Sequence, residues 1–421
     1  MDKMTTDNTP LLPQEELHEY VERHFRSGKA YLNRIKGNEL PLYLLDTGIL
    51  KEKARQFKKA FFDVLPNVDF YYAVKSNNHP DVAGTLLRYG FGLDVSSGLE
   101  LEMALDLNAR KIVFSGPGKT REELLLAVSN SERVTVLMDS FGELSRLQEI
   151  ASQEGHSIRS GIRLSTDRKW NKFGIAPEEL RSFCELAGKC PNVDLRGIQF
   201  HTSWNLTPDA QCGFIERLAG ILSVLPEDVR AQFEFLDVGG GYWPPEGEWL
   251  QPAGTVEGKL SAATGGPVQP PGAHYRIESM PIDMFAGKLA QQIQKDIFPL
   301  LDCRICFEPG RWICNDAMHL FLTVIDRKAG DLVITDAGTN AIGWERFETD
   351  YFPVLNLSNP SMVERDCNIL GSLCTPHDIW GYSYWGEDIK EGDILMIPCQ
   401  GAYTYSLRQE FIKPVPGVIT V

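Results

Sequence analysis

Apolar runs alternate with helix-like segments along most of the chain. Between the runs lie segments with helical spacing, such as HPDVAGTLLRYG and FGELSRLQEIASQEG, and several of them begin at Asp, Ser, Thr or Pro. Strands that alternate with helices predict parallel β-α units, and eight units predict a (β/α)8 barrel. The runs, rich in β-branched or aromatic residues, lie at 68–74, 91–95, 111–115, 134–139, 160–165, 195–201, 233–238 and 304–308.

The pattern of apolar and polar residues changes after Arg311, where short strand-like runs such as HLFLTVIDRKAGDLVITDAG and GDILMIPC are separated by turn residues. Helical periodicity is largely lost there, which predicts a β-rich second domain. A polar helix over 12–28 and a short strand over 41–46 precede the barrel. We therefore predict a barrel domain over 45–305, and a β-rich domain built from 1–44 and 306–421.

One connection interrupts the alternation of predicted strands and helices. Residues 243–276, WPPEGEWLQPAGTVEGKLSAATGGPVQPPGAHYR, are rich in Pro and Gly and show no periodicity. This composition predicts a long loop. Two interpretations stay open, a tolerated insertion and a cover over the active site.

Composition and charge narrow the class of protein. The formal net charge of −15 argues against nucleic acid or an anionic membrane as the partner. No stretch approaches the roughly 18 consecutive apolar residues of a membrane span. The first residues lack the basic region and apolar block of a secretory signal. Nine scattered cysteines indicate free thiols in a reducing cytoplasm. Cys303 and Cys306 lie within a predicted strand with no second pair at zinc-site spacing, so we expect no metal.

The chemistry of a barrel of this kind lies at the carboxyl ends of its strands. Lys75 follows the first apolar run, where partial desolvation would favour a Schiff-base amine, although a solvated surface lysine is the commoner case. Asp94 ends the second run and His201 the sixth. Glu308 ends the eighth. A lone histidine at such a position is more often structural.

Two loops indicate a phosphate. Gly239, Gly240 and Gly241 follow the seventh run, where glycines let backbone N–H groups approach an anion. Gly310 and Arg311 follow the eighth. Barrel enzymes commonly bind phosphate in these two loops. Together with Lys75, they favour a phosphate-bearing aldehyde, and pyridoxal 5′-phosphate (PLP) is such a cofactor.

The ordered motifs YYAVKSN, FGLDVSSGLELE, GIQFHTSW, LDVGGGYW, CFEPGR, DAGTN, GSLCTPHD and GAYTYS cover about 41–410. This set resembles the fold type III PLP-dependent decarboxylases, the family of the ornithine, diaminopimelate, arginine and carboxynorspermidine decarboxylases. The resemblance implies an alanine-racemase-like α/β fold, a barrel followed by a β-rich domain. It also implies a homodimer with shared active sites.

The same resemblance implies roles for individual residues. Lys75 would bind PLP as an imine, His201 would stack on its ring, and Glu308 would pair with the ring nitrogen. Asp94 and Ser97 match family positions near the lysine. Cys374 of a partner subunit would supply a proton to the substrate carbon. The phosphate would be held by Gly239, Gly240, Gly241, Gly310, Arg311 and Tyr403.

Departures from the family concern the substrate. Thr375 stands where the diaminopimelate and ornithine enzymes have an acidic residue that binds a distal amine, and Asp378 matches the second acidic position. His377 lies between them, and Arg346 could serve a substrate carboxylate in a shifted register. HTSW replaces the usual His-x-Gly-Ser. These differences favour a branch of siderophore or antibiotic biosynthesis that decarboxylates a carboxylate-rich amino-acid conjugate.

Three alternatives stay open. One is a diaminopimelate, ornithine, lysine or arginine decarboxylase of primary metabolism. Another is a decarboxylase of a carrier-bound amino acid, although two acidic proteins gain no long-range attraction. The third is a non-enzymatic homologue, which the intact lysine, phosphate loops and cysteine disfavour.

Overall fold

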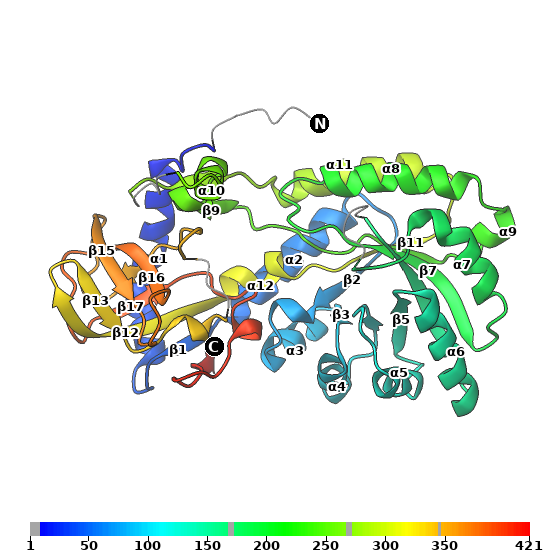
Figure 1. Ribbon diagram of the computed structural model, residues 1–421, viewed down its shortest axis with the longest axis horizontal. Helices are drawn as coiled ribbons and strands as arrows, with labels where there is room; N and C mark the ends of the chain where they lie inside the picture. The colour runs from blue at the N-terminus through cyan, green and yellow to red at the C-terminus, as the bar shows by residue number, and fades with distance from the viewer. Residues whose placement is uncertain (1–8, 167–171, 267–271, 344–346) are drawn as a thin grey trace. The chain divides into compact units, whose positions relative to one another are not determined.

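The computed structural model describes residues 9–166, 172–266, 272–343 and 347–421. The chain divides into two compact units. One is formed by Leu50–Trp243 and Met280–Cys314, and contains a closed barrel (Figure 1). The other is formed by the segment ending at Ile49, Pro244–Ser279 and Asn315–Val421, and contains a mixed β-sheet.

The barrel has eight strands among the described residues, all parallel and in chain order, with β11 closing against β2. Each strand overlaps one of the predicted apolar runs, so the predicted barrel is confirmed. The strands are β2 (Val68–Ala73), β3 (Gly92–Val95), β4 (Ile112–Phe114), β5 (Val134–Met138), β6 (Ile158–Leu164), β7 (Val193–Phe200), β8 (Phe235–Asp237) and β11 (Arg304–Phe307).

Polar caps start the helices that connect these strands. Thr120 and Glu123 form a capping box on α5, and Ser140 caps α6 by accepting from the Glu143 N–H. Gly155 ends α6 in the left-handed conformation. The helices of this unit are α2 (Thr47–Phe62), α3 (Pro80–Arg88), α4 (Gly98–Asp106), α5 (Arg121–Val128), α6 (Phe141–Glu154), α7 (Leu180–Ala187), α8 (Asp209–Ser223), α9 (Glu227–Arg230), α11 (Ile282–Asp296) and α12 (Arg311–Cys314).

Side chains fill the barrel interior. Val113, Leu137, Phe235 and Cys306 form a buried cluster against Tyr71. The ring of Phe235 lies where a Cβ on Gly197 would be, 2.0 Å from the nearest ring carbon. The strand-interior glycine therefore makes room for the aromatic ring, and the barrel is a packed core.

The β-rich unit is built on an eight-stranded sheet in the described residues, in the order β13-β15-β16-β14-β17-β12-β1-β18. The strand predicted over 41–46 is β1, which pairs with β12 and β18. The helix predicted over 12–28 extends further, as α1 (Gln14–Ile35). The strands are β1 (Leu42–Leu45), β12 (Met318–Ala329), β13 (Leu332–Thr335), β14 (Leu355–Asn356), β15 (Glu364–Leu370), β16 (Ile379–Trp385), β17 (Ile394–Ile397) and β18 (Gly417–Thr420).

The prediction of a long loop over 243–276 is wrong where the described part of the segment forms regular structure. The segment contains β9 (Glu248–Leu250), α10 (Val256–Ala263) and β10 (Tyr275–Ile277), and β9 and β10 pair antiparallel. Thr255 caps α10 by accepting from the Gly258 N–H. This cap was a local signal for a helix, but the high Pro and Gly content favoured the prediction of a loop.

This segment also changes the domain division. It belongs to the β-rich unit, whereas the sequence analysis placed it inside the barrel domain. Hydrogen bonds from Leu12 N–H to the His274 carbonyl and from Arg276 N–H to the Pro10 carbonyl tie it to the N-terminal region. Such pairings between distant segments cannot be read from local periodicity.

Three further findings concern the described residues. All nine cysteines lie within them as free thiols. No described helix combines the length and the apolar character needed to cross a bilayer. Within the same ranges, no group of three or more His, Cys, Asp or Glu side chains is arranged to hold a metal ion.

Candidate active site

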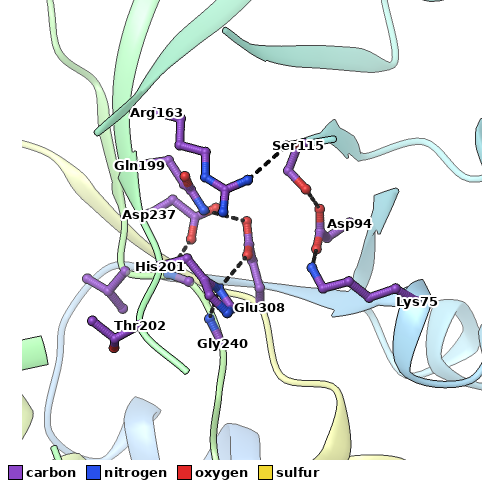
Figure 2. Close-up of polar contacts among 12 residues, drawn as sticks. Lys75, Asp94, Ser115, Arg163, Gln199, His201, Thr202, Asp237, Gly240 and Glu308 are labelled. Carbon is purple, nitrogen blue, oxygen red and sulfur yellow. Dashed lines mark hydrogen bonds and ion pairs between the residues drawn. The ribbon is translucent and has the colours of Figure 1, made fainter. Parts of the chain in front are cut away.

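The carboxyl ends of the barrel strands bring together polar side chains from distant parts of the sequence. Lys75 follows β2, Asp94 lies in β3 and His201 follows β7. Glu308 follows β11. Figure 2 shows Lys75 and Asp94 on one side of this rim, and His201 with Glu308 on the other. The expectation that strand ends converge is therefore met for these four residues.

Lys75 is paired with a buried carboxylate. Its Nζ donates to Asp94 Oδ2 at 3.1 Å, and the hydroxyl of Ser115 donates to Asp94 Oδ1. Asp94 is fully buried. Burial and the charge of Glu308 raise the pKa of Asp94, while Lys75 and Ser115 oppose the shift. Both oxygens have donors, so the carboxylate fixes the position of the lysine amine.

Glu308 is a buried carboxylate surrounded by groups that favour its charge. Burial alone would raise its pKa, but the neighbouring His201 ring and the charges of Lys75 and Arg163 outweigh it, so the pKa of Glu308 is lowered. Gln199 Nε2 lies 3.5 Å from Glu308 Oε1. An anion at this position can accept a hydrogen bond from a protonated ring nitrogen.

His201 links Glu308 to the glycine loop. Its Nδ1 accepts from the Gly240 N–H at 3.1 Å and lies 3.7 Å from Glu308 Oε2. One ring nitrogen cannot accept from Gly240 and donate to Glu308 at the same time. Burial lowers the pKa of His201. The neutral ring, with its proton on Nε2, therefore keeps the Gly240 hydrogen bond.

The glycine loop after β8 has no space for side chains. A Cβ on Gly240 would lie 2.3 Å from the Glu308 carbonyl oxygen, and Gly239 and Gly241 have φ of +69° and +82°. The Asn205 amide holds the loop by donating to the Gly240 carbonyl at 2.8 Å. Such a loop presents only backbone to a ligand, as a phosphate site requires.

Arg311 lies over an aromatic pair. Its guanidinium carbon is 4.4 Å from the centroid of the Trp243 ring, and Trp243 stacks with Trp204 at 5.9 Å. A Cβ on Gly310 would lie 2.8 Å from Ser76 Oγ. The glycine before Arg311 therefore permits a close approach of the two loops.

Ser97 has a structural partner. Its hydroxyl oxygen accepts from the Glu100 N–H at 3.3 Å and caps α4. The carboxylate of Glu100 in turn accepts from the Ser96 N–H at 2.7 Å. The hydroxyl is thus oriented by the helix end, and its part in cofactor binding stays a prediction.

Four side chains of this rim were given no role by the sequence analysis: Ser115, Arg163, Gln199 and Asp237. Gln199 lies two residues before His201, and Asp237 lies two residues before Gly239. Strand alternation was the available signal, since residues two apart on a strand face the same side. These residues were given no role because each lies within a predicted strand, whereas the search for chemistry concentrated on residues at or after the strand ends.

The remaining predicted residues belong to the β-rich unit. Cys374 and His377 are exposed, and His377 Nδ1 lies 3.2 Å from Glu348 Oε1. Thr375 is half-buried, as is Tyr403, which has a φ of +58°. Arg346 lies outside the described residues.

The carboxylate of Asp378 is hydrogen-bonded to other residues of the same unit. It is buried and accepts from the Thr339 N–H at 2.7 Å and the Leu373 N–H at 2.6 Å. The Thr339 hydroxyl adds a third hydrogen bond at 3.1 Å. The carboxylate therefore holds the 371–378 segment in place. Its oxygens are already occupied by these hydrogen bonds, which disfavours a direct role in substrate binding.

Comparison with known proteins identifies the barrel. The family model described as "Pyridoxal-dependent decarboxylase, pyridoxal binding domain" matches residues 47–258. A diaminopimelate decarboxylase of Aquifex aeolicus is 25% identical, over 94% of this chain and 91% of its own. An L-glutamyl-[BtrI acyl-carrier protein] decarboxylase of Niallia circulans is also 25% identical, over 87% of this chain and 85% of its own.

A solved structure agrees in fold. Diaminopimelate decarboxylase from Helicobacter pylori, complexed with L-lysine, superposes with a TM-score of 0.76 at 24% identity. The match covers 93% of this chain and 94% of that one. The fold is therefore of the alanine-racemase-like type that the sequence predicted.

The residues present fit PLP. A lysine amine lies against a buried carboxylate, a second buried carboxylate is kept anionic, and the glycine loop would be blocked by any Cβ. Gln199 Oε1 is buried without a hydrogen-bond partner. The chain belongs to the pyridoxal-dependent decarboxylase family and is a carboxy-lyase that uses PLP.

Proposed function

We propose that the protein removes the α-carboxylate of an L-amino acid as CO2 at the rim formed by Lys75, Asp94 and Glu308. The observation that carries the proposal is the buried Lys75–Asp94 pair opposite an anionic Glu308. Bound PLP supplies an electron sink for the bond that breaks. Glu308 holds a proton at the ring nitrogen and thereby strengthens that sink.

The chain's own residues bind and orient the cofactor. The Lys75 amine would hold the cofactor through its aldehyde, and His201 would pack against the ring. Asp94 would orient the amine, and Ser97 would act near the same lysine. The phosphate would be held by Gly239, Gly240, Gly241, Gly310, Arg311 and Tyr403.

Cys374 returns a proton to the substrate carbon after CO2 leaves. Its exposure supports this role, because an exposed thiol is available to a second copy of the chain. We propose a homodimer in which Cys374 of one copy completes the site of the other.

A mixing experiment tests this arrangement. Lys75→Ala homodimers should be inactive, and Cys374→Ala homodimers should keep only the residual activity of a site without the thiol. If the sites are shared, random exchange of subunits restores about a quarter of wild-type activity, because half the dimers are mixed and each has one intact site. Sites confined to one chain would give no recovery, and light scattering checks the dimer directly.

The substrate is an amino acid whose far end carries carboxylates instead of an ammonium. Thr375 is neutral, and the Asp378 carboxylate is used by Thr339 and Leu373. Among the described residues of the 371–378 segment, no carboxylate is left to pair with a distal amine. Arg346 would pair with a carboxylate of an anionic substrate, and His377 would add a hydrogen bond; a citryl-diaminopropionate conjugate of siderophore biosynthesis is such a substrate.

Two alternatives have specific support. Relatives named diaminopimelate decarboxylase favour a diamino acid of primary metabolism. The relative named for a glutamyl carrier protein favours a carrier-bound amino acid, which also lacks a distal ammonium. The Thr375 and Asp378 environment argues against the first alternative and is neutral toward the second.

A screen of CO2 release separates these substrates. The PLP-loaded protein is assayed with citryl-diaminopropionate, carrier-bound glutamate, diaminopimelate, ornithine, lysine and arginine. We expect the highest kcat/KM for the conjugate, and preference for any free diamino acid would contradict the proposal. Thr375→Glu should shift preference toward diamino acids by restoring an acid at that position.

We also propose that the enzyme works in the cytoplasm, which the nine free thiols support. Fractionation of cells that produce the full chain tests this. Recovery with membranes or with an exported fraction would contradict it.

A further inference from the structure

Two polar side chains beside Glu308, those of Gln199 and Asp237, form with it a buried group that is short of one hydrogen-bond donor. Gln199 and Asp237 are aligned neighbours on β7 and β8, and Asp237 is aligned with Cys306 on β11, two residues before Glu308. The side chains of Gln199, Asp237 and Glu308 are all buried. Gln199 Oε1 and Asp237 Oδ2 both lack a hydrogen-bond partner. With Glu308 they form a group in which acceptors outnumber donors.

A proton on Asp237 removes this deficit. Two ionised carboxylates buried side by side repel each other, and each unpaired buried acceptor carries a desolvation penalty. A protonated Oδ2 turns an orphan acceptor into a donor facing Glu308 and Gln199 (Figure 2). Turning the Gln199 amide over would not help, because it would take from Glu308 the hydrogen bond that Nε2 makes at 3.5 Å.

The other oxygen of Asp237 is anchored. Oδ1 accepts from the Gly239 N–H at 2.8 Å, and the Gly239 carbonyl accepts from the Glu308 N–H at 2.9 Å. Asp237 thus touches both the glycine loop and the carboxylate after β11. We infer that Asp237 is a positioning residue: as a neutral acid it donates to Glu308, keeps Glu308 anionic and aligns it with the glycine loop.

The electrostatic surroundings agree with this assignment. Burial and the charge of Glu308 raise the pKa of Asp237 well above its ordinary value, whereas the pKa of Glu308 is lowered. The one proton of the pair therefore resides on Asp237. The titratable groups that act on this pair from the surrounding elements are Tyr71, Lys75, Asp94, Arg163, His201, Tyr242 and Cys306.

The inference rests on the family's cofactor and on the proposed pairing of Glu308 with its ring nitrogen. It is independent of which amino acid is decarboxylated. Its first test therefore uses no substrate. Infrared spectroscopy of the protein, with and without PLP, should show a carboxylic-acid C=O band that shifts with 13C-labelled aspartate and in D2O. The band should be missing in Asp237→Asn, and its presence there would overturn the assignment.

Variants provide the second test. Asp237→Asn keeps a donor toward Glu308 and an acceptor for Gly239, so PLP affinity should stay within about threefold of wild type. Asp237→Leu removes both and should weaken PLP binding by about tenfold or more, with circular dichroism confirming the fold. If Asp237 is instead an anion, Asn should weaken binding as much as Leu does.

Asp94→Asn is the matched control. Asp94 is also a buried aspartate of this rim, but it accepts from Lys75 and Ser115 and must be an anion. Its amide variant should lose the imine absorbance that Asp237→Asn retains. Equal damage by the two amides would contradict the neutral assignment of Asp237.

Discussion

The rim of the barrel and the 371–378 segment of the β-rich unit hold their functional groups in different ways. At the rim, Asp94 and Glu308 are buried and are fixed by other side chains of the rim. In the segment, Cys374 and His377 are exposed, and the buried Asp378 binds mainly backbone. The proposed cofactor site is therefore built from buried strand ends, whereas the proposed substrate-selecting residues lie on an exposed segment held by the buried Asp378.

Lys75→Ala should give the largest effect. Loss of the amine removes the covalent attachment of PLP, so CO2 release should fall by about three orders of magnitude or more. The visible absorbance of the purified protein and its borohydride labelling should disappear together. A variant that still binds PLP as an imine would show that another lysine has this role. Lys111→Ala, an exposed lysine paired with Asp69, is the matched control.

Glu308→Gln should come next, with a fall in kcat of about a hundredfold. The amide cannot stabilise a proton on the ring nitrogen, but it preserves shape and some hydrogen bonding. Glu100→Gln is the control, since burial raises the pKa of Glu100 to about 7 and a neutral side chain should be tolerated there. Equal losses in both variants would point to folding damage instead of a role at the ring.

Cys374→Ala should lower kcat by about tenfold to a hundredfold while PLP affinity stays unchanged. The thiol acts on the substrate carbon and not on the cofactor. Equilibrium titration with PLP and steady-state kinetics separate the two effects. Cys367→Ala removes a buried thiol of the same unit and shows the cost of cysteine loss in itself.

Asp378→Asn should act mainly on stability and on KM. Replacing one acceptor oxygen weakens hydrogen bonds from Thr339 and Leu373, which should lower the free energy of unfolding by about 1–3 kcal/mol. We expect KM to rise more than kcat falls, because the loop that carries Cys374 loosens. If binding of diamino acids is lost while stability is unchanged, Asp378 binds substrate after all.

The smallest effect at neutral pH concerns His319 in the β-rich unit. Burial lowers its pKa to about 4, while the unfolded chain binds the proton near pH 6.5. The unfolded state therefore gains the proton first as pH falls, and stability declines between these values. At pH 5 the loss should reach about 2 kcal/mol in urea unfolding. His319→Gln, which can still accept from the Cys399 N–H, should show a smaller decline, and the remainder should come from His24, whose pKa is also lowered by burial.

The sequence predicted the cofactor half of the site better than the substrate half for a physical reason. Parallel strand ends must converge, so Lys75, Asp94, His201 and Glu308 could be placed together from order alone. Asp378 looked available in sequence because burial and backbone partners leave no local pattern. The roles of Asp237 and Gln199 were missed because their proximity to Glu308 follows only from the alignment of neighbouring strands.

The order of segments in the β-rich unit has a consequence for synthesis of the chain. Strand β1 precedes every barrel strand in the chain, whereas its partners β12 and β18 both follow the barrel. The barrel can therefore form during synthesis while β1 still lacks both of its sheet partners. Until β12 and β18 are made, both edges of an apolar strand stay uncovered and can pair wrongly. Deletion of β18 would leave one of these edges exposed in the folded protein.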